Sequence, residues 1–94
     1  MPETVVIQPP VEIDPATAST LDEQLSAVDP AGVTELDCSA VTFCDSSGIR
    51  VLILHATRHR DAGGTFRIVR LSPAVQRVFD LAGVSELLGV QPEG

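Results

Sequence analysis

Hydrophobic residues along this chain alternate between short strand-like runs and segments with the period of a helix. The strand-like runs are rich in β-branched and aliphatic residues and lie at Thr4–Gln8, Val11–Ile13, Val33–Cys38 and Phe66–Leu71. Between them, apolar residues such as Ile49, Leu52 and Ala56 recur three and four positions apart, which is the spacing of one buried helix face. The alternation of strands and helices predicts an α/β domain with a partly parallel sheet.

Capping residues and helix breakers give the expected bounds of the helices. Asp14 and Pro15 offer a cap and a proline at the first helical position, and Asp29–Gly32 would stop that helix. Ser72 and Pro73 begin a later helix in the same way. The predicted helices span about residues 14–28, 46–62 and 73–82, followed by a short helix at Val84–Leu88 and an edge strand or tail at Gly89–Gln91.

The Asp-Ser-Ser-Gly sequence at residues 45–48 lies at the junction between a strand-like region and a predicted helix. Its hydroxyls would stand beside unpaired backbone N–H groups and the positive end of the helix dipole, a place that tolerates a phosphate. The same residue types also cap ordinary helix N-termini. Local chemistry therefore leaves a plain cap and a phosphate-accepting site both open.

Three blocks of the sequence resemble the STAS domain, most of all its stand-alone form, the bacterial anti-sigma factor antagonists. The blocks are Leu36–Ile49, which contains the Asp-Ser-Ser-Gly sequence, Glu12–Ala18 and Leu71–Val84. The resemblance runs from about residue 5 to residue 90 and covers nearly the whole chain. It implies one small α/β domain over residues 1–94, with a mixed four- to five-stranded sheet and about four helices packed against it.

The resemblance also implies a function and a set of site residues. In this family the first serine of the motif is phosphorylated, which here is Ser46. An unphosphorylated antagonist sequesters an anti-sigma factor with serine-kinase activity and so regulates transcription. That kinase phosphorylates the antagonist with ATP and ends the complex, and a serine phosphatase resets it. We expect Asp14, Asp45, Ser47 and Gly48 to complete the partner-binding surface. In that surface Ser47 would supply a cap oxygen, and Gly48 would let the partner's backbone come close.

Two positions depart from the family pattern. Pro10 and Val11 stand where a glycine commonly precedes the Glu12 block, and Arg50 stands where a small residue is often found. Arg50 lies one helical turn from Ser46, where its charge would partly neutralise a phosphate and blunt the switch. Partner identity and switch strength therefore stay open.

The formal net charge of −7 is unevenly distributed. Nine of the 13 acidic residues and no Lys or Arg lie in residues 1–45, a sum of −9. The other four acidic residues and all six Arg lie in residues 46–94, a sum of +2. An acidic surface keeps a protein soluble and also steers a basic partner. The pI of about 4.5 argues against nucleic-acid binding.

The sequence predicts a soluble, cytoplasmic protein with no membrane segment. Its first residues lack the basic start and apolar run of a signal peptide. The longest aliphatic run, Val51–Leu54, is far shorter than the roughly 20 residues that span a membrane. We expect Cys38 and Cys44 to be small core residues and not a disulfide.

Neither catalysis nor a metal or cofactor is expected. His55 follows Ser46 by nine residues, and the resulting axial distance of about 13 Å is too long for a base and its nucleophile. His55 and His59 have metal-binding spacing without an evident third ligand, which favours a solvated polar face. The main alternative function is a non-switching STAS scaffold or a ligand-sensing subunit of a signalling assembly. A regulatory tail of an anion transporter is disfavoured because no membrane segment is present.

Overall fold

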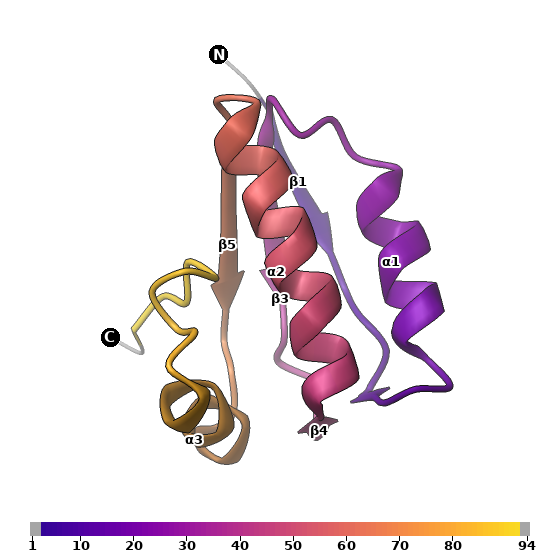
Figure 1. The fold of residues 1–94 in the computed structure, drawn as a ribbon, viewed down its shortest axis with the longest axis vertical. Helices are drawn as coiled ribbons and strands as arrows, with labels where there is room; N and C mark the ends of the chain where they lie inside the picture. The colour runs from indigo at the N-terminus through magenta and orange to yellow at the C-terminus, as the bar shows by residue number, and fades with distance from the viewer. Residues whose placement is uncertain (1–2, 93–94) are drawn as a thin grey trace.

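Three parallel strands form the central sheet of the protein, which the computed structural model describes over residues 3–92. The strands lie in the order β1 (Thr4–Ile7), β3 (Val33–Asp37), β5 (Thr65–Val69). Helices α1 (Ala18–Ser26) and α2 (Ser46–Asp61) cover one face of this sheet (Figure 1). Strand β3 alternates accordingly, with Thr34 and Leu36 buried and Glu35 and Asp37 on the opposite face.

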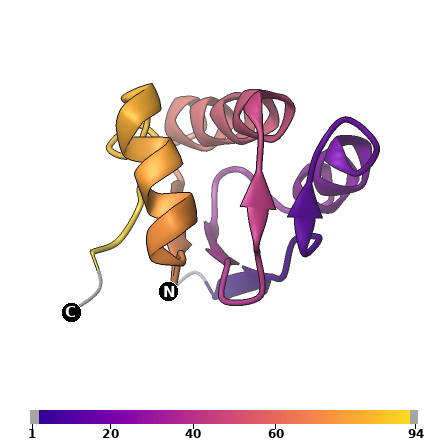
Figure 2. The same ribbon diagram turned by 90° about the horizontal axis from the view of Figure 1, so that it is seen from below.

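A second, two-stranded sheet lies at one end of the domain. β2 (Glu12–Ile13) pairs in parallel with β4 (Phe43–Cys44). Figure 2 views this end and shows α3 (Pro73–Ala82) to one side of the small sheet and α1 to the other. The expected single mixed sheet is therefore wrong: within residues 3–92 the strands form two sheets and every strand pair is parallel. The physical reason is that helices α1 and α2 carry the chain back between successive strands of a sheet, which aligns those strands.

The first helix is shorter than the sequence predicts, because Asp14 caps a turn and not the helix itself. Its Oδ1 accepts hydrogen bonds from the backbone N–H of Ala16 at 2.9 Å and of Thr17 at 3.1 Å. The helix then starts at Ala18. The bounds of α2 and α3 are close to those expected, and Gly83 ends α3 with a φ of 71° in the left-handed region.

The predicted fourth helix at residues 84–88 is also wrong, because residues 85–89 form successive turns. Gly83 and Gly89 both have a positive φ, so they bound a segment too short for helix nucleation. The backbone N–H of Val90 bonds to the carbonyl of Ser85, five residues back. Val90 then forms a parallel bridge with Ile68, which confirms the expected edge pairing at this single position.

The uncovered face of the central sheet carries a network of ion pairs. Arg67 Nε lies 3.1 Å from Glu35 Oε2, and Arg70 Nε lies 3.1 Å from Asp37 Oδ1. Arg70 has a φ of 60°, which is uncommon for a residue other than glycine. The hydrogen bond from Arg70, followed by that from the Ser39 backbone, lowers the pKa of Asp37 to about 2.

This pKa predicts a pH-dependent contribution of Asp37 to stability. The folded-state pKa of about 2 lies below the usual pKa of 3.8 for an aspartate, so the stabilisation is present above about pH 4 and is lost as the pH falls to 2. Asp37→Asn should lower the free energy of unfolding by about 1 kcal/mol at neutral pH. Guanidinium unfolding between pH 7 and pH 2 measures this, with exposed Glu23→Gln as control. If the difference in unfolding free energy between Asp37→Asn and wild type stayed constant with pH, the stabilisation would not come from the ionised Asp37 carboxylate.

Candidate functional site

The register of the small sheet places the two predicted loop segments side by side. Ile13 is level with Cys44, and each is followed directly by an aspartate of the predicted site, Asp14 and Asp45. The backbone N–H of Asp45 donates to the carbonyl of Ile13 at 3.0 Å. The structure therefore brings together the Asp14 turn and the start of α2, although they are about thirty residues apart in the chain.

Asp45 is the N-cap of α2. Its Oδ1 accepts hydrogen bonds from the backbone N–H of Ser47 at 2.9 Å and of Gly48 at 3.4 Å, and from the Ser47 hydroxyl. The Ser47 hydroxyl bond, with the two backbone bonds, lowers the pKa of the Asp45 carboxyl below its usual value. The cap oxygen expected from Ser47 is thus supplied by Asp45, and Ser47 orients that carboxylate.

Ser46 is the exposed hydroxyl of the loop. It is the first residue of α2, it is exposed while Ser47 is half-buried, and its hydroxyl makes no hydrogen bond within residues 3–92. A modification of Ser46 therefore leaves the capping bonds of Asp45 intact. Asp14, like Asp45, is half-buried, and the register of the small sheet places it beside Asp45.

Gly48 lies beneath this surface. A Cβ added at Gly48 would lie 2.4 Å from Ile13 Cγ2 and 2.8 Å from Cys44 Sγ, both far inside contact distance. Glycine at this position lets the first turn of α2 rest directly on the small sheet. Its close approach is therefore to side chains of its own domain, which accounts for the glycine without a partner.

The sequence predicts a solvated face for the two histidines of α2. That prediction is wrong, because both side chains are buried. His55 Nε2 lies 2.6 Å from Asp22 Oδ1, and its Nδ1 accepts from the Arg58 guanidinium at 2.8 Å. His59 Nδ1 donates to the carbonyl of His55, and its Nε2 lies 2.8 Å from the Thr34 hydroxyl. Each ring nitrogen already has a protein partner, so the pair ties α2 to α1 and to β3. Within the described residues, no group of three or more metal-ligating side chains is present.

Both cysteines are free and buried, as the sequence predicts. Burial raises the pKa of Cys38 to about 12 and that of Cys44 to about 11. Thiols with such a high pKa are poor nucleophiles near neutral pH. They act here as small core side chains.

Sequence reasoning missed two exposed apolar side chains beside the loop. Phe43 and Val11, on the small sheet and at its start, have exposed fractions of 49% and 53%. Phe43 is followed in β4 by the buried Cys44, but Thr42 and Phe43 are both exposed. Strict alternation starting from the buried Val41 would have placed Phe43 inside, so the sequence pattern gave no signal for this outward aromatic ring. Together with Ser46 they give this end of the domain a mixed apolar and polar surface.

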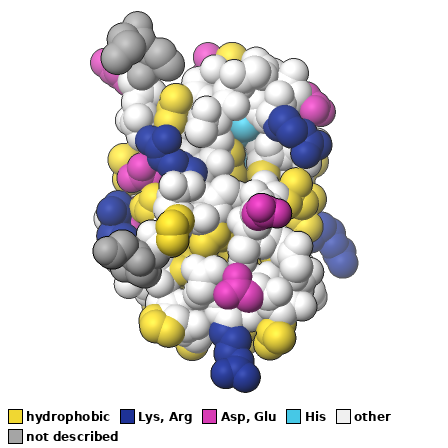
Figure 3. All heavy atoms as spheres, turned by 90° about the vertical axis from the view of Figure 1, so that its left-hand side faces the viewer, with side chains coloured by type: hydrophobic (Ala, Val, Ile, Leu, Met, Phe, Trp, Pro, Cys, Tyr) yellow, Lys and Arg dark blue, Asp and Glu magenta, His cyan; other side chains and the backbone are white. Residues whose placement is uncertain are grey.

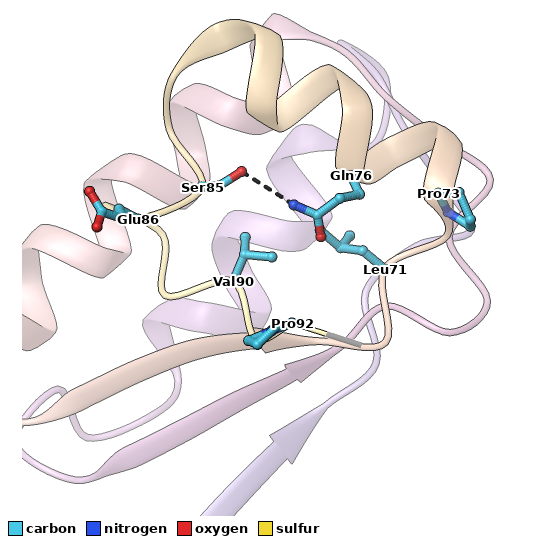
Figure 4. A pocket seen from close by; sticks show the side chains of 7 residues that line it. All are labelled: Leu71, Pro73, Gln76, Ser85, Glu86, Val90 and Pro92. Atoms are coloured by element: carbon cyan, nitrogen blue, oxygen red, sulfur yellow. Dashed lines mark hydrogen bonds between the residues drawn. The ribbon is translucent and has the colours of Figure 1, made fainter. Parts of the chain in front are cut away.

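Away from the loop, the described surface has a pocket beside α3. Among the described residues, the face shown in Figure 3 has no broad basic area. On this face, Arg side chains lie apart from one another, some of them beside acidic side chains. A pocket of about 420 Å³ lies beside α3 (Figure 4), lined by Leu71, Pro73, Gln76, Ser85, Glu86, Val90 and Pro92. None of these lining residues belongs to the loop at 45–48, so the pocket and the loop are separate features. Within residues 3–92, no helix combines the length and the apolar character needed to cross a bilayer.

Comparison with known proteins identifies the family. A family model described as "Mlab, STAS domain" matches residues 2–89. The chain belongs to this STAS family. The resemblance that the sequence suggested is therefore confirmed, and with it the small α/β STAS domain.

Two solved structures share the fold of this STAS domain. The murine Solute Carrier 26 family member A9 anion transporter, in its inward-facing state, matches with a TM-score of 0.75 and 19% identity. That match covers 100% of this chain and 17% of the transporter chain, so this chain spans a small part of that protein's length. The Bacillus cell fate determinant SpoIIAA, in its phosphorylated form, matches with a TM-score of 0.67 and 23% identity, covering 100% of this chain and 86% of SpoIIAA.

The packing around Gly48 predicts that Gly48→Ala lowers the stability of the protein, whereas helix propensity predicts that it raises it. Propensity alone would make Gly48→Ala stabilising by up to about 1 kcal/mol. The contacts with Ile13 and Cys44 instead predict a loss of about 1–3 kcal/mol, because an added methyl overpacks the junction. Gly32→Ala is the matched control, since its nearest non-neighbouring atom would lie at 3.4 Å. Urea unfolding of both variants measures the difference, and a Gly48→Ala protein as stable as wild type would contradict the packing.

Proposed function

We propose that this STAS domain is an anti-sigma factor antagonist whose binding surface is switched by phosphorylation of Ser46. With a free hydroxyl, it sequesters an anti-sigma factor that is also a serine kinase, and with a phosphate it releases that partner. The observation that carries this proposal is the exposure of Ser46 at the start of α2, where its hydroxyl makes no hydrogen bond to any described residue and Asp14 and Asp45 lie at the same end of the domain. Membership of the STAS family and the fold shared with phosphorylated SpoIIAA support the proposal.

In the proposed phosphoryl transfer, this chain contributes only the acceptor hydroxyl of Ser46. The Ser46 oxygen attacks the γ-phosphorus of ATP bound by the partner, the bond to the bridging oxygen of ADP breaks, and the hydroxyl proton passes to a base of the kinase. The antagonist supplies an accessible acceptor on a rigid helix start. His55 of the same helix is buried and both its ring nitrogens are engaged, so it does not serve as that base.

The phosphate would act through charge and bulk without refolding the domain. It adds about −1.5 to −2 charges at neutral pH, next to an Asp45 whose lowered pKa keeps it ionised. Like charges brought together at an interface cost several kcal/mol, and each 1.4 kcal/mol is tenfold in affinity. An affinity loss of roughly 10²–10³ follows, while the capping bonds made by Asp45 persist.

The alternative is a STAS scaffold or ligand-sensing subunit that does not switch. The pocket beside α3 favours this alternative, because it is separate from the loop and has the size of a small-molecule site. The match of this whole chain to a small part of an anion transporter also supports this alternative, because there the fold is one part of a longer chain. Such a subunit would keep its partner whether or not Ser46 is modified.

Phosphate mapping tests the switch most directly. Incubation of the purified protein with source-cell extract and Mg-ATP should place phosphate on Ser46 alone, and Ser46→Ala should take up none. Ser47→Ala is the matched control, because it keeps the exposed hydroxyl of Ser46. Absence of phosphate on the wild-type protein, in an extract active on another substrate, would move the function to the scaffold alternative.

Binding of the purified kinase then separates the two functions. Ser46→Ala should stay bound in the presence of ATP, and Ser46→Asp should bind at least tenfold more weakly than wild type, since it places one negative charge at the same point. Titration by calorimetry measures both affinities. Wild-type binding by both variants would show that the loop is only a structural cap.

A further inference from the structure

A groove between α1 and α2 opens beside the same end of the domain and has no assigned role. It has a volume of about 400 Å³ and is lined by Ala18, Ser19 and Asp22 of α1 and by Arg50, Val51 and Leu54 of α2. Leu54 has an exposed fraction of 53%, so the groove displays a large aliphatic side chain to solvent. A volume of this size lies within the range of sites that bind ligands or side chains, about 300–1,000 Å³.

The two walls of the groove carry opposite charges. Asp22 stands on the α1 wall, where its bond to His55 holds the carboxylate in place while 47% of its side chain stays exposed. Arg50 stands on the α2 wall, where it is exposed. Apolar side chains lie with these two charges in the lining. A complementary ligand therefore presents an apolar group flanked by a base toward Asp22 and by an acid toward Arg50.

We propose that this groove receives an apolar side chain of the partner polypeptide, and that Arg50 links its occupancy to the state of Ser46. This inference rests on the proposed function and extends it, because it names a second contact surface and the chemistry of the partner segment. The segment carries one acidic residue that pairs with Arg50. Phosphate on Ser46 competes for the same guanidinium and removes it from that pair.

The spacing on α2 permits this competition. Ser46 and Arg50 are four residues apart on one helix, so their side chains are surface neighbours, with Cβ atoms about 5–6 Å apart. A guanidinium forms strong, often bidentate hydrogen bonds with either a phosphate or a carboxylate. It cannot direct the same donors at both. Arg50, which the sequence pattern alone suggested would blunt the switch, thereby strengthens release of the partner.

A phosphorus NMR titration tests the link without any partner. Phosphoserine is installed at position 46 during translation, and the second pKa of its phosphate is measured in wild type, Arg50→Ala and Arg60→Ala. Arg60 is the matched control, because it lies on the same helix but about 21 Å from Ser46 along the helix axis. Loss of Arg50 should raise the phosphate pKa by about 0.2–0.5 unit, and loss of Arg60 should leave it unchanged. Equal pKa values in all three proteins would overturn the link.

Methyl and amide spectra of the same samples report on the groove. The resonances of Val51 and Leu54 should shift on phosphorylation in wild type and shift less in Arg50→Ala, because only the former moves a guanidinium out of the groove. Identical shifts in both proteins would show that the phosphate does not act through Arg50.

Binding measurements test the occupant, with the kinase that labels Ser46 as the probe. Leu54→Ser should weaken binding tenfold or more, whereas Val6→Thr, a residue of matched exposure on the central sheet, should not. Phosphorylation should reduce affinity less in Arg50→Ala than in wild type, because both changes remove the same contact. The proposal would be overturned if Leu54→Ser bound with wild-type affinity. It would also be overturned if phosphorylation reduced affinity by the same factor in Arg50→Ala as in wild type.

Two other outcomes separate this inference from the proposed function. If no kinase labels Ser46, the proposed function fails, yet the phosphorus titration still decides whether Arg50 responds to a phosphate. If the protein forms a dimer that Leu54→Ser abolishes, the groove belongs to a second copy of the chain, and the inference about a partner segment is overturned.

Discussion

The contact of Gly48 with Ile13 and Cys44 is the constraint on which the arrangement of the candidate site depends. Because Gly48 has no side chain, the first turn of α2 rests directly on the pair β2–β4. That contact places the start of α2, with Ser46 as its first residue, beside the turn that follows β2. A larger residue at position 48 would push the helix away from the small sheet and separate the two halves of the proposed surface.

Helix α2 then connects the core, the loop and the groove. Its buried side holds His55 and His59, whose hydrogen bonds reach α1 through Asp22 and β3 through Thr34. Its first residue is the exposed Ser46, and its outer side carries Arg50 into the α1–α2 groove. On the proposed function, these contacts would hold the backbone of α2 in place while a charge added at Ser46 acts on the neighbouring surface.

Hydrogen bonds at the loop separate the capping carboxylate of Asp45 from the exposed hydroxyl of Ser46. Three donors of the loop converge on one oxygen of Asp45 and lower the pKa of its carboxyl, and those donors belong to Ser47 and Gly48 and not to Ser46. The cap and the proposed phosphate-accepting hydroxyl of Ser46 are therefore separate residues. The Asp-Ser-Ser-Gly sequence is consistent with both roles because the motif contains a residue for each.

The amino-acid sequence by itself determined the features that depend on a few neighbouring residues. These include the alternation of elements, the caps at Asp45 and Ser72, the stop at Gly83 and the exposed position of Ser46 at a helix start. Tertiary structure alone decided the parallel pairing of β2 with β4, the burial of the two histidines and the turns after Gly83. Two-residue strands carry no register signal of their own, and the partners of His55 and His59 lie 33 and 25 residues away. Local propensity acts over a single turn, whereas these features depend on contacts that exist only once distant segments have packed together.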